Sequence, residues 1–315
     1  AHVLMIGDAM GDFTAAKTYV ETREEPPVVK ASGLCKGKGV IVPSSIDEAV
    51  AALDRMMNRI EFGEAGRTVV VEERLEGSEV SVLALVDGRN IYLLEPCQDH
   101  KRLGDHDTGP NTGGMGVFCP GGLVEGRDDA LLAQIQSEVL VPTLDALRRE
   151  GIEYRGVMYA GLMLTPAGPK VLEYNCRFGD PECQALMMRL ESDVIELMLA
   201  TAGTPPGSAG GAASPRVRLD EIDVRWRPGA SCVVVLAAPG YPDKPCAGLP
   251  ITGVDQAARL PGVQVFHAGT RIEAASAGEA NGGLVTAGGR VLNVCAVGDT
   301  LAQARELAYA AARLI

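Results

Sequence analysis

The chain has 315 residues, which is enough for two or three domains with a substantial core. Its apolar fraction of 46% and mean hydropathy of +0.09 are ordinary for a globular protein, and no apolar run is long enough to cross a membrane. The net charge of −12 argues against a general nucleic-acid surface, so a phosphate ligand must meet locally concentrated cations. The eight scattered cysteines include no Cys-x-x-Cys pair, which indicates buried free thiols in a reducing cytoplasm rather than a zinc site or a disulfide framework.

The first part of the chain is predicted to alternate short strands with helices. In order these are a strand at 3–6, a helix at 13–23, a strand at 27–30, its hairpin partner at 40–42, a helix capped by Ser45 or Asp47 and running to about 59, and a strand at 68–73. The hairpin tip at 31–39 is rich in glycine and lysine. Such a tip can fold over phosphates, and a solvated surface turn is an equally good interpretation of this segment taken alone.

The rest of the chain is predicted to form hairpins, helices and a final small domain. The elements are strands at 80–86 and 90–94 around the turn Asp87-Gly88, a helix at 131–150, strands at 159–165 and 170–175, a helix at 192–202 ending at Gly203, a strand at 230–238 and a helix at 300–315. Residues 96–123 read as one long loop, and loops of that length are usually functional or disordered. The low-complexity segment 204–215 reads as a flexible linker.

The most informative segment runs from residue 170 to residue 182. It begins as a strand, so Glu173 and Asn175 share one face. Two oxygen ligands side by side suit Mg²⁺, which takes its remaining ligands from water and nucleotide phosphates. Arg177 follows at a position from which it can reach an anion held by that metal. A strand end with a polar turn is the plain alternative, but the turn Arg177-Phe-Gly-Asp-Pro-Glu182 is too specialised for an ordinary surface.

Two further segments carry polar groups in suggestive patterns. The strand end at 69–75, followed by Glu79, can offer backbone groups to an adenine edge and a carboxylate to ribose hydroxyls, although an acidic exposed strand end is the better interpretation of that segment alone. In the second segment, His100 could be a general base or a structural hydrogen-bonding residue. The many small residues of 107–116 imply backbone pressed against a ligand or a neighbouring strand.

Taken in order, these segments resemble ATP-grasp enzymes and, most closely, the phosphoribosylamine–glycine ligase family. The resemblance rests on 28–40 as a phosphate hairpin, 98–102 with 107–116 as a substrate loop, 177–182 as the family signature, and 286–292 as part of a C-terminal domain. It implies an α/β multidomain protein with an ATP-grasp fold. The expected parts are a remnant of an N-terminal Rossmann-like domain at 1–12, a small lobe at 13–78, a central lobe at 79–225 and a small β-rich C-terminal domain at 226–315.

The resemblance also implies a set of site residues. ATP would be bound by Lys30, Gly37, Lys38, Gly39, Glu72, Glu73, Leu75 and Glu79, and Mg²⁺ or Mn²⁺ by Glu173 and Asn175. The substrates glycine and 5-phosphoribosylamine would meet Asp99, His100, Thr108, Gly109, Asn111, Gly179 and Asp180. The catalytic set would be Arg177, Asp107 and Lys101. Two departures from the family pattern stand out: Lys36 replaces the usual alanine, and the strand at 159–164 lacks the metal-binding glutamate of many ATP-grasp relatives.

The implied activity is ligation of glycine to 5-phosphoribosylamine through glycyl phosphate, a step of purine biosynthesis in the cytoplasm, by a monomer or weak dimer that binds neither nucleic acid nor membrane. Two alternatives stay open. One is another carboxylate–amine ligase of the same fold with a different acceptor, which the 107–116 segment argues against. The other is a non-catalytic nucleotide-binding protein, which the combination of Lys30, Glu173, Asn175 and Arg177 argues against.

The beginning of the chain departs from the family. Its members open with a strand and Gly-Ser-Gly-Gly-Arg-Glu-His inside a domain of about a hundred residues. Here the strand at 3–7 leads directly into 8–13, which resembles the segment just before the ATP-binding lobe. We therefore expect residues to be missing between Gly7 and Phe13, with consecutive Cα atoms there much further apart than the roughly 3.8 Å of a trans peptide.

Overall fold

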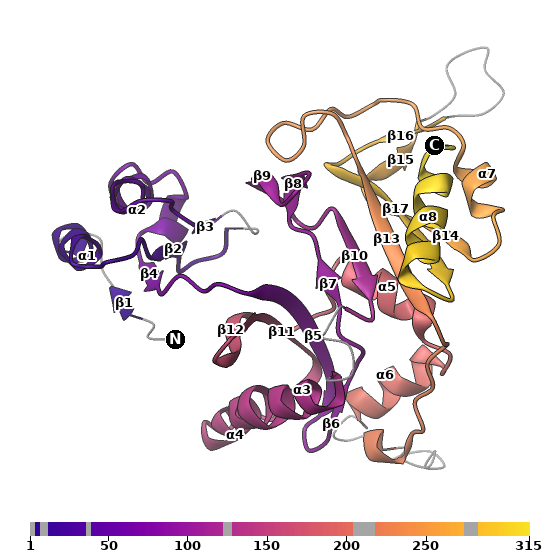
Figure 1. Cartoon of the computed structure of the whole chain (residues 1–315), viewed down its shortest axis with the longest axis horizontal. Coiled ribbons are helices and arrows are strands. Elements are labelled where there is room, and N and C mark those ends of the chain that lie inside the picture. The colour runs from indigo at the N-terminus through magenta and orange to yellow at the C-terminus, as the bar shows by residue number, and fades with distance from the viewer. Residues whose placement is uncertain (1–3, 7–11, 36–38, 122–127, 204–217, 274–282) are drawn as a thin grey trace, which may run out of the picture. The chain divides into compact units, whose positions relative to one another are not determined.

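The computed structural model describes residues 4–6, 12–35, 39–121, 128–203, 218–273 and 283–315. The chain divides into two compact units, one formed by 1–78 with 165–170 and the other by 79–164 with 171–315 (Figure 1). Among the described residues, no helix combines the length and apolar character needed to cross a membrane. The chain break expected between Gly7 and Phe13 falls on residues 7–11, which lie outside the described residues.

The first unit is a four-stranded antiparallel sheet with two helices packed on it. The sheet has the order β1-β4-β2-β3. Its elements are β1 (Leu4–Ile6), α1 (Asp12–Glu21), β2 (Val28–Ala31), β3 (Val40–Ile41), α2 (Ile46–Leu53) with a π-helical continuation at Asp54–Asn58, a 3-10 turn at Gly63–Gly66, and β4 (Val69–Glu72). The strand at 3–6 was expected to belong to a remnant of an N-terminal Rossmann-like domain. Instead β1 pairs with β4, which covers an edge that would otherwise expose unpaired backbone groups.

Local sequence explains the first unit well. Ser45 caps α2, because its side chain accepts a hydrogen bond from the Glu48 amide at 3.1 Å; the alternative cap Asp47 lies inside the helix. One face of each helix is apolar. The core contains Ala16 and Val20 from α1, Ala49, Ala52 and Leu53 from α2, Met56 and Met57 from its continuation, and Val29, Val69 and Val71 from the sheet. This core holds β2 and β4, the strands that carry the predicted nucleotide-binding residues.

The second unit contains a four-stranded sheet, β12-β11-β5-β6, and a five-stranded sheet, β14-β17-β13-β10-β7. The strands are β5 (Ser78–Asp87), β6 (Ile91–Leu93), β7 (Gln98–Asp99), β8 (Arg102–Gly104), β9 (Thr108–Asn111), β10 (Gly116–Cys119), β11 (Arg155–Thr165), β12 (Gly168–Asn175), β13 (Ala230–Ala237), β14 (Val263–His267), β15 (Thr270–Ile272), β16 (Leu284–Thr286) and β17 (Arg290–Gly298). The helices are α3 (Asp128–Ile135), α4 (Val141–Arg149), α5 (Glu182–Arg189), α6 (Val194–Ala202), α7 (Val254–Ala258) and α8 (Leu301–Ala312), with a 3-10 turn at Leu219–Glu221. Helices α3 and α4 are joined by a π-helical segment at Gln136–Leu140, so the predicted helix at 131–150 is interrupted.

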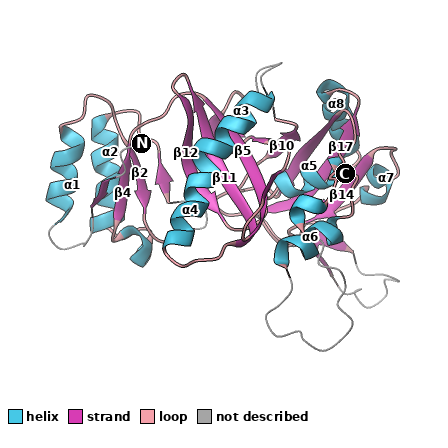
Figure 2. Cartoon of the chain, turned by 90° about the horizontal axis from the view of Figure 1, so that it is seen from below, coloured by secondary structure: helices cyan, strands magenta, loops and turns pink. Residues whose placement is uncertain are grey.

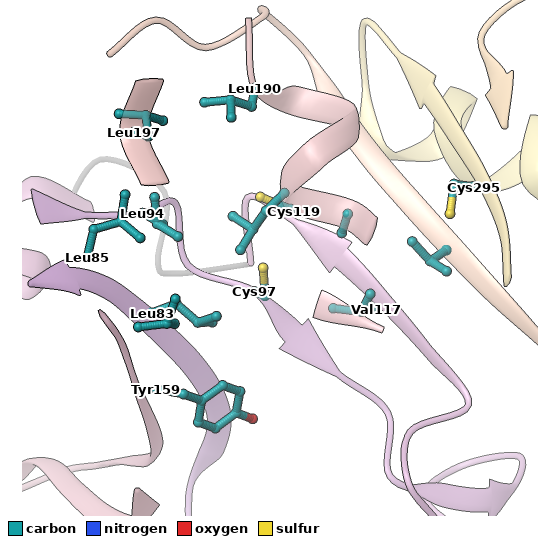
Figure 3. Close-up of a cluster of buried hydrophobic side chains, with 14 of the residues drawn as sticks. Leu83, Leu85, Leu94, Cys97, Val117, Cys119, Tyr159, Leu190, Leu197 and Cys295 are labelled. Carbon is teal, nitrogen blue, oxygen red and sulfur yellow. The ribbon is translucent and has the colours of Figure 1, made fainter. Parts of the chain in front are cut away.

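Strand β5 lies between two hydrophobic cores of the second unit. Its even positions from Val80 to Val86 pack with α3 and α4, which cross the β12–β11–β5 face in Figure 2. Its odd positions Leu83 and Leu85 pack in the opposite core with residues of α5 and α6, some of which Figure 3 draws. The strict alternation follows from the two-residue period of a strand. Because both faces are buried, β5 is a rigid base for the polar groups near its start.

Residues 96–123 were expected to form one long loop, and that expectation is wrong. The segment contains four short strands, of which β10 pairs with both β7 and β13. Val117 and Cys119 of β10 are buried on one face, so a two-residue period was present but was masked by the surrounding glycines and prolines. The five-stranded sheet therefore joins strands from both sides of the domain boundary predicted at 225.

Two smaller expectations also need correction. The β5–β6 turn consists of Gly88 and Arg89, one residue later than predicted, because Asp87 stays in the strand and accepts backbone hydrogen bonds from Arg89 and Asn90 at 2.9 and 2.6 Å. The cysteines are all free, but Cys176 and Cys246 are exposed rather than buried.

Candidate functional site

Strand β12 presents two oxygen-bearing side chains at its end. Glu173 and Asn175 share one face of β12 and are at least partly exposed. Neither side chain forms a hydrogen bond or ion pair with another described residue, so their oxygens are available to a ligand. Gly161 on β11 lies against the Glu173 side chain. A larger residue at this position would crowd Glu173, because an added Cβ would lie only 3.2 Å from its Cγ.

This donor set fits a hard divalent cation that takes its other ligands from water and phosphate, as Mg²⁺ does. Within the described part of the chain, no group of three or more His, Cys, Asp or Glu side chains could hold a metal ion by itself. The described residues thus offer two oxygen-bearing side chains rather than a complete set of protein ligands. That arrangement is typical of a metal bound together with a nucleotide.

Lys101 and Glu79 form an ion pair beside this strand. The Lys101 Nζ lies 3.1 Å from a Glu79 carboxylate oxygen. Burial alone would lower the pKa of Lys101, but the negative charges of Glu79 and Glu173 outweigh it, so the pKa is raised. Two residues expected to act separately, one on ribose and one in catalysis, are therefore coupled.

Asp99 is a carboxyl group without a partner. It makes no hydrogen bond or ion pair with another described residue, and its Oδ1 is buried without a hydrogen-bond partner. Burial, reinforced by the negative charge of Glu182, raises the pKa of Asp99 to about 8, while Lys101 and Arg290 act in the opposite direction. Gly114 lies against this carboxyl group, since an added Cβ would be 2.8 Å from Oδ1. A half-buried carboxyl group with one buried, unsatisfied oxygen is stabilised by a proton or by a cationic ligand.

Glu182 is the functional candidate that the sequence interpretation missed. Its side chain is buried, and its Oε1 accepts a hydrogen bond from the Tyr159 hydroxyl at 2.9 Å. The Ser81 hydroxyl lies 2.7 Å from the Tyr159 oxygen and donates more weakly to Glu182 at 3.4 Å. Burial, with the nearby charge of Glu182, raises the pKa of the Tyr159 phenol well above its usual range. The available signal was the position of Glu182 as the last residue of the signature and the first of α5, from which its side chain turns into the core.

The signature turn presents Arg177 and fixes Asp180. Arg177 is exposed, donates to the Phe178 carbonyl at 2.8 Å, and forms no ion pair with a described residue. Asp180 accepts from the guanidinium of Arg290 at 3.1 Å and from the Gln184 amide at 2.8 Å. Gly179 is buried, and a side chain there would collide with the Glu182 carboxylate. The turn therefore exposes the Arg177 guanidinium while Gly179 and Asp180 are fixed by their neighbours.

The substrate residues predicted near residue 100 belong to two different surfaces. Lys101 pairs with Glu79 and interacts with Asp99, whereas His100 and Arg102 line a cavity. The His100 ring lies 6.0 Å from the Phe118 ring and lines a cavity of about 650 Å³ together with Asp107. Thus His100 and Asp107 belong to a different surface from Asp99.

The predicted substrate residues Thr108, Gly109 and Asn111 lie in the hairpin formed by β8 and β9. Thr108 donates to the Asp105 carbonyl at 2.7 Å, the Gly109 carbonyl accepts from Arg102 at 2.8 Å, and Asn111 pairs with Arg102 across the strands. Asp107 has a positive φ of 56° at the hairpin tip. These hydrogen bonds all stay within the hairpin.

In the first unit, the charged residues predicted to bind the nucleotide form ion pairs. The Lys30 Nζ lies 2.6 Å from Glu72, and Lys170 lies 2.8 Å from Glu73. Leu75 is half-buried in the extended segment after β4. Gly39 is buried, and an added Cβ would lie 2.8 Å from the Cys35 sulfur. The predicted phosphate contacts Gly37 and Lys38 lie outside the described residues.

A small antiparallel lobe and a second unit with two oxygen-bearing side chains at a strand end are features of the ATP-grasp class of proteins. Residues 7–183 match the phosphoribosylglycinamide synthetase ATP-grasp (A) domain, and residues 231–315 match the C domain of the same family. The chain belongs to the phosphoribosylglycinamide synthetase family.

Individual relatives agree with this assignment. A phosphoribosylamine–glycine ligase of Rhodopirellula baltica is 46% identical over 95% of the chain and 65% of its own length. One of Caulobacter vibrioides is 47% identical over 96% of the chain and 66% of its own length, and one of Vigna unguiculata is 43% identical over 95% and 90%. The chain thus spans slightly less than two thirds of the first two relatives.

Solved structures show the same fold. The crystal structure of phosphoribosylamine–glycine ligase from Thermotoga maritima superposes with a TM-score of 0.75 at 32% identity, covering 99% of this chain and 71% of the other. An N5-carboxyaminoimidazole ribonucleotide synthetase from Thermus thermophilus, at 16% identity, has a TM-score of 0.57 over 99% of this chain and 67% of its own. This second likeness concerns the fold alone.

The raised pKa of Asp99 predicts a specific pH dependence of stability. Between the ordinary aspartate value of about 3.9 and the folded value of about 8, the folded state binds more protons than the unfolded state. The free energy of unfolding therefore falls as pH rises through this window. Asp99→Asn removes the titration, so the urea midpoint of the variant relative to the parent should increase steadily from pH 4.5 to pH 8.5. A matched Asp105→Asn change on the exposed hairpin should give a constant difference, and a constant difference for Asp99→Asn would contradict the assignment.

Proposed function

We propose that this protein ligates glycine to 5-phosphoribosylamine at the expense of ATP, releasing glycinamide ribonucleotide, ADP and phosphate. The observation that supports this best is that Glu173 and Asn175 at the end of β12 have no hydrogen-bond or ion-pair partner among the described residues, and that Arg177 just after the strand donates to the Phe178 carbonyl and to no described carboxylate. Two hard oxygen ligands next to an open guanidinium suit a metal-bound phosphoryl group. Family membership supports the choice of substrates.

The chemistry asks for alignment and charge neutralisation more than for a protein nucleophile. The glycine carboxylate attacks the γ-phosphorus of ATP, and the bond to the ADP oxygen breaks. The amine of phosphoribosylamine then attacks the acyl carbon, phosphate leaves, and the amine loses a proton. Glu173 and Asn175 would hold Mg²⁺ or Mn²⁺, which neutralises phosphate charge when bound. Arg177 would stabilise the transferring phosphoryl group through its planar pair of donors.

Asp99 supplies a subsite for the ammonium group of glycine. It has no partner among the described residues, and Glu182 adds a second buried negative charge nearby. A primary ammonium group would neutralise this negative charge and donate charge-assisted hydrogen bonds to the carboxylate oxygens. Gly114 packs against the carboxyl group, where any side chain would collide with Oδ1. His100 and Asp107 line the separate cavity beside Phe118, so we give them no role in this subsite.

An assay of ADP release with both substrates tests the function directly. We expect ADP only when glycine and phosphoribosylamine are both present, with glycinamide ribonucleotide accumulating in equal amount. Turnover with other amino acids but not with glycine would indicate a different carboxylate–amine ligase. ATP binding without turnover would indicate a non-catalytic nucleotide-binding protein. We further propose that the protein acts as a monomer or weak dimer in the cytoplasm, and its free cysteines support the reducing compartment.

Glu173→Gln should lower turnover by at least about 100-fold while the protein stays folded, because it keeps the shape but removes a metal-directed charge. The measurement is kcat for ADP release at moderate Mg²⁺ concentration, alongside a urea unfolding curve. Glu150→Gln, an equivalent change at an exposed site after α4, serves as the matched control. Near-parental kcat in Glu173→Gln would show that β12 does not hold the metal.

Arg177→Lys should lower kcat far more than it changes the KM for ATP. A point ammonium cannot reproduce the fork of a guanidinium, and the need for that fork is greatest in the transition state. Steady-state kinetics with varied ATP distinguishes the two parameters, with Arg149→Lys on the exposed end of α4 as control. A rise in KM alone would instead make Arg177 a residue for ground-state binding.

A further inference from the structure

Arg290, the first residue of β17, connects two loops that are far apart in the sequence. Its Nη1 donates to the Gly113 carbonyl at 2.6 Å and to the Asp180 carbonyl at 2.5 Å. Its Nη2 donates to the Asp180 carboxylate at 3.1 Å. Gly113 belongs to the segment between β9 and β10, and Asp180 belongs to the signature turn. One guanidinium therefore holds both segments.

Tyr241 completes the contact from the same part of the chain. Its hydroxyl oxygen accepts a hydrogen bond from the Gly113 amide at 2.9 Å. Its ring covers Gly289, where any side chain would collide with it. An added Cβ on Gly113 would lie 3.0 Å from the Arg290 guanidinium carbon. Both backbone groups of Gly113 are thus occupied by Arg290 and Tyr241, and glycine at 113 and 289 permits the approach.

The two segments that Arg290 holds each adjoin a group with a proposed role. Gly114 packs against the Asp99 carboxyl group, and it also approaches Pro181, since an added Cβ would be 2.8 Å from the proline Cδ. Arg177 lies three residues before Asp180 in the same turn. A shift of either segment would therefore move Asp99 relative to Arg177. Small displacements of this kind, about 1 Å, can cost about 100-fold in rate.

We propose that Arg290 and Tyr241 are positioning residues that fix the Gly113–Gly114 segment against the signature turn and so set the separation between Asp99 and Arg177. The kinetic part of this proposal rests on the proposed ligase function. The guanidinium already donates to two carbonyls and a carboxylate, so its role is to hold protein groups rather than substrate. Arginine is required because its planar set of donors can reach three acceptors at once, which a lysine ammonium on a flexible stem cannot do with the same geometry.

Kinetics of the full chain tests the proposal. Arg290→Lys should lower kcat for ADP release by about 10- to 100-fold and leave the KM values for ATP and glycine within about threefold. Tyr241→Phe keeps the ring over Gly289 and removes only the acceptor, so a smaller loss is expected. The double variant should lose less than the product of the single losses, because both residues hold Gly113. Arg271→Lys, an exposed arginine paired with Glu273, is the matched control.

Amide hydrogen exchange provides a readout that is independent of turnover. In Arg290→Lys, peptides covering 112–116 and 178–181 should both exchange at least about tenfold faster, whereas β5 and β17 should keep their parental protection. Unchanged exchange in either segment, or a raised KM for one substrate with an unchanged kcat, would overturn the proposal. If the parent protein failed to release ADP, the ligase function would fail while exchange still tested the contact. If Arg290→Lys failed to fold, Tyr241→Phe would supply the comparison for the peptide covering 112–116, which should still exchange faster than in the parent.

Discussion

The buried carboxylate of Glu182 is the contact on which the site depends most. It accepts from the Tyr159 hydroxyl at 2.9 Å and connects the start of α5 with β11 and, through Ser81, with β5. A buried carboxylate is costly to desolvate and persists only when hydrogen bonds satisfy it. Because β5 packs on both faces, the carboxylate is held firmly. Its charge in turn acts on Asp99, so one structural contact also sets the electrostatics of the neighbouring site.

The short segment from the end of β7 to the start of β8 divides its polar groups between two surfaces of the second unit. Asp99 and Lys101 point toward the charged groups around Glu79 and Glu173, whereas His100 points to the cavity beside Phe118. Adjacent residues of one motif therefore face different surfaces of the protein. A role assigned to a motif as a whole has to be resolved residue by residue once the strand direction is known.

Features that depend on local rules could be predicted from the sequence, including the Ser45 cap, the end of α6 at Gly203, and the shared face of Glu173 and Asn175. The contacts that organise the site could not. Ser81 and Glu182 are 101 positions apart, and Arg290 and Gly113 are 177 apart, so no periodicity or capping rule links them. The strands at 98–119 were missed because glycine and proline concealed a short alternating pattern whose pairing partner lies more than a hundred residues later.

The charges of the site are balanced for a bound state rather than for the free protein. Glu79, Glu173 and Asp99 all act on Lys101, and Glu182 acts on Asp99, so four carboxyl groups lie in a region whose nearest cations are Lys101 and Arg290. Such a surface repels the phosphates of ATP unless further positive charge arrives with the ligands. In the proposed function, a divalent cation at Glu173 and Asn175 and the ammonium group of glycine at Asp99 would supply that charge at the two places where carboxylates have no partner among the described residues. Burial, reinforced by the charge of Glu182, raises the pKa of Asp99, so the protonated form of this carboxyl group is favoured by the same surroundings.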